Sequence, residues 1–243
     1  MDLLVIKYIT AWKSVSDPTF SSAGGRFLPN SVKLKERTEV LPIIAKEKMF
    51  FVNRESAVLQ LQRIHQSNFE RTKTTDGLDF TVPICDNNFG LGKSAFARKY
   101  IDCGKESMYA ASSDRTVELE FKEMLSHAIT VPIAFREGEF SDEKRIEEIM
   151  LKKLQDALIP LFEISPPCLY KSSYPTTADF LSELITEVGP VFVSLDEIGF
   201  AFHIQDRNDI QRRDLFLRFC SGVLRNWLVV PELFFWFWVV DPS

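Results

Sequence analysis

The sequence lacks the features expected of a membrane protein, of a chain with a signal peptide, and of a general nucleic-acid binder. No apolar run in its 243 residues approaches the length of a membrane-spanning helix. The apolar start, residues 1–7, is short and has an acid near its front, so it predicts a strand or short helix rather than a signal peptide. The net charge of −5 argues against broad electrostatic binding to nucleic acid. We therefore expect no membrane attachment and no general nucleic-acid partner.

The chain also lacks the cysteine and histidine spacing of a metal site. Its four cysteines and three histidines are scattered, which argues against a zinc site and against a Cys–His catalytic pair. Cys85 and Cys220 fall in apolar runs and are expected to be buried thiols. His203 follows Asp196 closely enough to line the same cleft, although an ordinary loop histidine is the simpler explanation.

One segment differs by a single residue from a phosphate-binding loop. Residues 86–94 read Asp-Asn-Asn-Phe-Gly-Leu-Gly-Lys-Ser, with Asn87 where the pattern requires its first Gly. A predicted strand over 78–85 precedes the segment and a predicted helix over 95–103 follows it, as the pattern demands. Asn tolerates the left-handed region better than most residues, so we expect the loop shape to survive. The alternative is a tight turn before a helix, with no ligand.

The residue types of this segment suit a nucleotide. Backbone N–H groups at a helix start hold phosphate oxygens. Lys93 would reach the β- and γ-phosphates, and the Ser94 hydroxyl would ligate Mg²⁺. The expected nucleotide-binding residues of the loop are Asn87, Asn88, Phe89, Gly90, Leu91, Gly92, Lys93 and Ser94.

A second motif lies downstream, where an apolar β-branched run over 191–195 ends in two carboxylates. Such a run predicts a buried parallel strand. We assign Asp196 to the metal and Glu197 to the general base that activates water. Taken alone, the pair would suit any strand end that meets solvent; the order after Gly-Lys-Ser makes the assignment specific.

Together these Walker A and Walker B segments resemble P-loop NTPases of the branch with an extra strand and a catalytic glutamate, which includes AAA+ and STAND ATPases. Residues 51–55, Phe-Val-Asn-Arg-Glu, resemble a STAND-type motif, and this likeness places Arg54 at the nucleotide base. Residues 83–94 with 195–197 are similar to NTPase domains of Crinkler-type effectors and retrotransposon hot spot proteins. The resemblance implies ATP and Mg²⁺ as ligands, and hydrolysis with Lys93 and Glu197 as catalytic residues.

The resemblance leaves two functions open. The first is an ATP-hydrolysing switch or motor, located in the cytoplasm or nucleus, or secreted and host-directed if the chain is a Crinkler-type effector. The second is a nucleotide-binding interaction module with little turnover, which Asn87 favours. No guanine-reading Asn-Lys-x-Asp string occurs, and ATP is expected from the resemblance.

Alternating strands and helices predict an α/β fold: a three-layer P-loop NTPase core with a mostly parallel sheet, lacking its last strand and the C-terminal lid. We divide the chain into an N-terminal extension, 1–49, and an NTPase domain, 50–243. The remaining predicted helices cover 116–127, 141–158, 176–188 and 206–227, and the remaining strands cover 128–135, 191–195 and 233–240. Residues 67–77 are predicted to form a loop.

Several features of the sequence leave parts of the predicted fold and site open. Pro83 and Pro132 fall inside predicted strands, so each needs a bulge or an early strand start. The aromatic strand at the C-terminal end would leave an apolar edge, which a second copy or another protein would have to cover. Asp241 could sense the γ-phosphate or serve only the turn chemistry of an Asp-Pro end, and arginines on the 206–227 helix could supply a cation or simply be solvated.

Overall fold

The computed structural model describes residues 4–6, 55–73, 80–86, 96–97, 99–102, 116–141, 145–162, 174–203 and 208–239. A single five-stranded sheet runs through these residues, in the order β1-β2-β5-β4-β3. Its strands are β1 (Leu4–Ile6), β2 (Val82–Asp86), β3 (Ile129–Ala134), β4 (Val191–Asp196) and β5 (Leu233–Val239). Strands β2, β5, β4 and β3 are parallel to one another, while β1 pairs with β2 in the antiparallel direction. The α/β prediction with a mostly parallel sheet is confirmed at this level.

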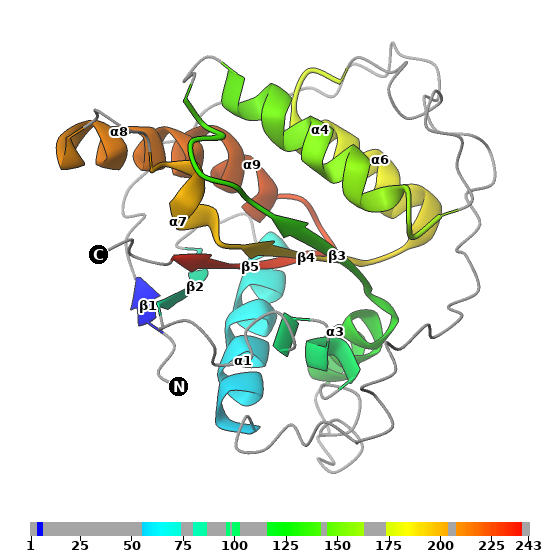
Figure 1. Ribbon diagram of the computed structural model, residues 1–243. Coiled ribbons are helices and arrows are strands. Elements are labelled where there is room, and N and C mark those ends of the chain that lie inside the picture. The colour runs from blue at the N-terminus through cyan, green and yellow to red at the C-terminus, as the bar shows by residue number, and fades with distance from the viewer. Residues whose placement is uncertain are drawn as a thin grey trace, which may run out of the picture.

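Helices cover both faces of the sheet, as a parallel sheet requires (Figure 1). One face, here the α1 face, carries α1 (Glu55–Thr72), α3 (Thr116–His127) and the 96–102 helix, formed by residues 96–97 and 99–102. The other face, here the α4 face, carries α4 (Ile146–Leu158), α6 (Thr177–Val188) and α9 (Arg225–Leu228). The two faces bury separate apolar clusters.

The remaining elements join β4 to β5 on the α4 face. They are α7 (Ile198–Ala201), α8 (Asp209–Phe219) and a π-helical turn, η3 (Cys220–Leu224), that leads into α9. The predicted helix over 206–227 is confirmed from Asp209 onward as one continuous helical segment, except that residues 220–224 form a π-helical turn instead of α-helix. Cys220 is half-buried in that turn, and burial raises the pKa of its thiol to about 12, which agrees with an inert thiol.

Local sequence signals explain where several helices begin and end. Thr176 caps α6 in a capping box: its side chain accepts from the Asp179 N–H, and the Asp179 carboxylate accepts from the Thr176 N–H. Gly189 ends α6 at a positive φ of 84°. α1 continues through Thr72, so the predicted loop over 67–77 is wrong in its first part.

The order of the strands explains how Pro83 and Pro132 are accommodated in the sheet. β3 is an edge strand, and its register with β4 runs through Pro132 without a bulge, because an edge strand leaves one side of its backbone unpaired. In β2 the pairing with β5 begins only at Ile84, after Pro83, so Pro83 faces β1 alone.

β5 is an inner strand, between β2 and β4, and its aromatic side chains at 234–237 are buried. The predicted exposed C-terminal edge is therefore a wrong prediction for the strand over 233–239. A second copy or another protein is expected from the sequence only to cover that edge, so this reason for a partner no longer applies.

Candidate functional site

The carboxyl ends of the parallel strands meet at one edge of the sheet. β2, which precedes the first sequence motif, and β4, which carries the second, both end at this edge. Ile84, Phe237 and Leu195 form one row across the sheet. Asp86, the last residue of β2, therefore lies level with Glu197, two strands away. Because neighbouring strands are about 4.8 Å apart, the segment that follows Asp86 leaves the sheet about 10 Å from Glu197.

The side chain of Asp196 belongs to the α1 face. Along β4, Val191, Val193 and Leu195 join the apolar cluster of the α4 face, while Phe192 joins that of the α1 face. Successive side chains of a strand alternate between faces. Asp196 thus follows Phe192 on the α1 face, two residues beyond the buried Ser194.

The 96–102 helix points its N-terminal end toward this same edge and covers this same face. The rings of Tyr100 and Phe192 lie 4.9 Å apart, and those of Phe96 and Trp236 lie 4.6 Å apart. Trp236 is in register with Ser194, two strand positions closer to the carboxyl edge than Phe192. Phe96, near the start of the helix, therefore lies closer to the carboxyl edge and Asp196 than Tyr100 does.

Glu197 has a left-handed backbone, with φ 58° and ψ 30°, directly after β4 and before α7. A non-glycine residue with positive φ is uncommon, and such strain is concentrated at functional sites. Its side chain makes no capping hydrogen bond to α7, and the residue is half-buried. The left-handed residue turns the chain from β4 into α7 at the carboxyl edge of the sheet.

A buried histidine joins α1, the 96–102 helix and β5. The Nε2 of His65 lies 3.0 Å from the Phe235 carbonyl oxygen, and its Nδ1 lies 2.9 Å from the Tyr100 hydroxyl. Because a carbonyl only accepts, Nε2 carries the proton and Nδ1 accepts from Tyr100. Burial lowers the pKa of His65 to about 4 against the opposing effect of the backbone bond. The sequence gives no signal for this contact.

The phosphate-loop residues 87–94, together with Arg54 and Asp241, lie outside the described residues. Of the predicted site, the structure places Asp196 and Glu197. His203 lies beyond α7, with its Nε2 3.6 Å from a carboxylate oxygen of Glu137.

The arginines of α8, at 212, 213 and 218, belong to the helix that covers the opposite, α4 face. α8 buries Leu215 and Phe219 in the cluster of that face, and the Phe216 ring lies 6.2 Å from that of Phe237. The side chain of Asp196 emerges on the other side of the sheet, so these arginines do not share its face.

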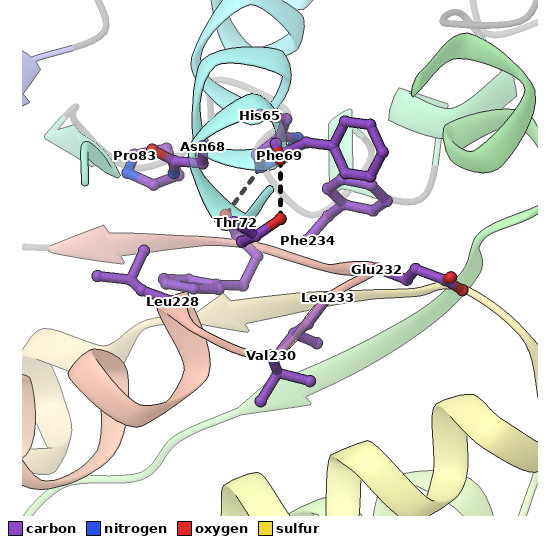
Figure 2. A pocket seen from close by; sticks show the side chains of 11 residues that line it. His65, Asn68, Phe69, Thr72, Pro83, Leu228, Val230, Glu232, Leu233 and Phe234 are labelled. Atoms are coloured by element: carbon purple, nitrogen blue, oxygen red, sulfur yellow. Dashed lines mark hydrogen bonds between the residues drawn. The ribbon is translucent and has the colours of Figure 1, made fainter. Parts of the chain in front are cut away.

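A small cavity lies at the opposite, amino end of the sheet (Figure 2). It has a volume of ≈ 20 Å³ between α1 and β5, and His65, Asn68 and Glu232 are among its lining residues. That volume holds about one water molecule. The cavity is too small for a nucleotide, and it lies far from the Asp196 edge.

Two negative findings apply to the described part of the chain. It contains no cluster of three or more His, Cys, Asp or Glu side chains arranged to hold a metal ion. Within it, no helix is both long and apolar enough to cross a bilayer.

Comparison with known proteins adds no relative. No protein-family model matches the chain, and neither the curated proteins nor the solved structures include a match.

Proposed function

We propose that this chain binds a nucleoside triphosphate with Mg²⁺ at the carboxyl edge of its sheet and hydrolyses it, as P-loop ATPases do. The observation that carries the proposal is the direction of the 96–102 helix. Its N-terminal end points to the edge and face where Asp196 emerges, and in the sequence only Ala95 separates it from Gly92-Lys93-Ser94.

The sheet order supports the same location. The described helices between β2 and β3 lie on the α1 face, whereas those between β3 and β4 and between β4 and β5 lie on the α4 face. In open α/β sheets, ligands bind outside the carboxyl ends where connections change face. β5 lies between β2 and β4, which agrees with the resemblance to the P-loop branch that has an extra strand.

The donor set fits magnesium. Mg²⁺ in nucleotide sites is held by one or two protein oxygens together with phosphates and water, so a single carboxylate, Asp196, with the Ser94 hydroxyl is sufficient. A cluster of three acids is not required. The bound ion would neutralise phosphate charge, while Lys93 would hold the β- and γ-phosphates.

Glu197 would accept a proton from the attacking water, whose oxygen bonds to the γ-phosphorus. The bond from that phosphorus to the bridging oxygen breaks, and its electron pair stays on the diphosphate. The products are a nucleoside diphosphate and inorganic phosphate, and the proton passes from Glu197 to solvent. The left-handed backbone of Glu197, directly after β4, supports this role, because such backbone conformations are concentrated at functional sites.

Replacing Lys93 by alanine tests binding. We expect Lys93→Ala to weaken Mg-ATP binding roughly 10- to 100-fold, because a charged donor to phosphate contributes about 1.5–3 kcal/mol. Isothermal titration calorimetry measures the change. Lys99→Ala is the matched control, since Lys99 is exposed on the same helix and its side chain pairs with Asp102. Equal affinities for wild type and Lys93→Ala would contradict the proposal.

A further inference from the structure

Arg136 follows closely after β3, the strand whose last residue lies beside Asp196. Ala134 is in register with Asp196, and the Phe135 N–H donates to the Asp196 carbonyl at 3.1 Å. Val131, Ile133 and Phe135 are buried on the α4 face. From this alternation we place the exposed Arg136, two residues after the end of β3, on the opposite side, which is that of Asp196. If residues 135 and 136 keep the strand rise, the Cα atoms of Arg136 and Asp196 are about 8 Å apart.

The backbone around Arg136 is fixed to α7. The Arg136 N–H donates to a carboxylate oxygen of Glu139 at 3.0 Å. Beyond it, the Gly138 N–H donates to the Phe200 carbonyl at 3.0 Å, and the Phe140 N–H donates to that of Ala201 at 2.9 Å. Arg136 and Glu197 are therefore held by one hydrogen-bonded unit, the turn after β3 and the helix after β4.

The acids of this turn face other groups. Glu139 pairs with Lys153 at 2.7 Å, and Glu137 lies beside His203. Among the residues that the structure describes, the Arg136 guanidinium has no ion pair or hydrogen bond. Only its backbone is held, so the guanidinium is a free cation beside the edge where the proposed γ-phosphate would lie, with no counter-ion among the described residues.

We propose that Arg136 contacts the γ-phosphate of the bound nucleotide and stabilises the negative charge that gathers on it during hydrolysis. This inference rests on the proposed function. It assigns the cation to the same chain and to the turn after β3, rather than to α8, whose arginines lie with the α4 face. A planar guanidinium suits the role, since it offers paired donors to phosphate oxygens.

The test compares Arg136→Ala, Arg136→Lys and the control Arg213→Ala, an exposed α8 residue, in Mg-ATP and Mg-ADP binding and in phosphate release. We expect Arg136→Ala to lower kcat at least about 100-fold, with ADP affinity within about twofold of wild type. Arg136→Lys should recover part of the loss, and Arg213→Ala should match wild type. The preference for ATP over ADP should fall at least about tenfold in Arg136→Ala.

The outcomes separate this inference from the proposed function. An unchanged kcat in Arg136→Ala, with an active wild type, identifies a solvated arginine and overturns the inference alone. If wild type binds without turnover, an unchanged ATP-to-ADP preference overturns it in the same way, and a reduced preference supports it. If wild type binds no nucleotide, both proposals fail together.

Discussion

Replacing Glu197 by glutamine is expected to lower nucleotide hydrolysis roughly 100- to 10,000-fold, the range for loss of a general base. Gln keeps the size and hydrogen-bonding capacity of the side chain but cannot take the proton from water. Affinity for Mg-ATP should stay within about threefold, because Glu197 acts on water and not on the phosphates. Phosphate release under single-turnover conditions, with binding measured by calorimetry, checks both parts.

Glu232 supplies the matched control for this prediction. It also has a left-handed backbone, with φ 63°, but it precedes β5 at the amino end of the sheet. Glu232→Gln should leave hydrolysis unchanged. Wild-type binding without phosphate release would favour the interaction module over the ATPase, and full activity in Glu197→Gln would contradict the assigned role.

Glu197→Gly adds a stability measurement to the same prediction. Glycine adopts positive φ without the steric cost that glutamate has, and no capping bond is lost. The variant should therefore be more stable by up to about 1 kcal/mol while it loses hydrolysis. If Glu197 is kept in an unfavourable backbone conformation for the sake of its function, replacing it should raise stability and lower activity together.

The second large effect is a loss of stability in acid caused by His65. The folded chain keeps this imidazole neutral, with its pKa lowered to about 4 from 6.5, whereas the unfolded chain protonates it near 6.5. As the pH falls from 6.5 toward 4, the unfolded state binds a proton that the folded state does not. The free energy of unfolding should therefore fall by about 2 kcal/mol between pH 7.5 and pH 5 from this group alone.

Urea unfolding of wild type and His65→Gln at the two pH values isolates this contribution. Gln can donate to the Phe235 carbonyl and accept from Tyr100 but does not titrate. The free energy of unfolding of His65→Gln should therefore fall by about 2 kcal/mol less than that of wild type over the same pH range. Other titrating groups contribute equally to both proteins and cancel in the comparison. Equal losses in the two proteins would contradict a neutral, buried His65.

The sequence predicts this fold best where a local signal exists. The capping box of Thr176 and the apolar repeat of α4 mark their helices because capping and periodicity are properties of neighbouring residues. The π turn at 220–224 gives no such signal, since it departs from the α-helical repeat by only a single residue. Sheet order has no local signal either, and it decides both how Pro132 is tolerated and why β5 is buried.

The candidate site divides in the same way. Asp196 and Glu197 can be identified from the sequence, because an apolar strand that ends in two acidic residues is a recognisable pattern. The positive φ of Glu197 is invisible in the sequence, since glutamate is not a residue that favours it. Arg136 is sixty residues before Asp196, and only the β3–β4 register brings the two together.

The central claim is that the loop and the end of β4 hold one Mg-nucleotide between them. A double-mutant cycle with Ser94→Ala and Asp196→Asn, read as the free energy of Mg-ATP binding, tests it most directly. If both side chains hold the same ion, the double variant should lose at least about 1 kcal/mol less than the sum of the single losses. Losses that add within about 0.5 kcal/mol would mean that the two residues act independently and would contradict the claim.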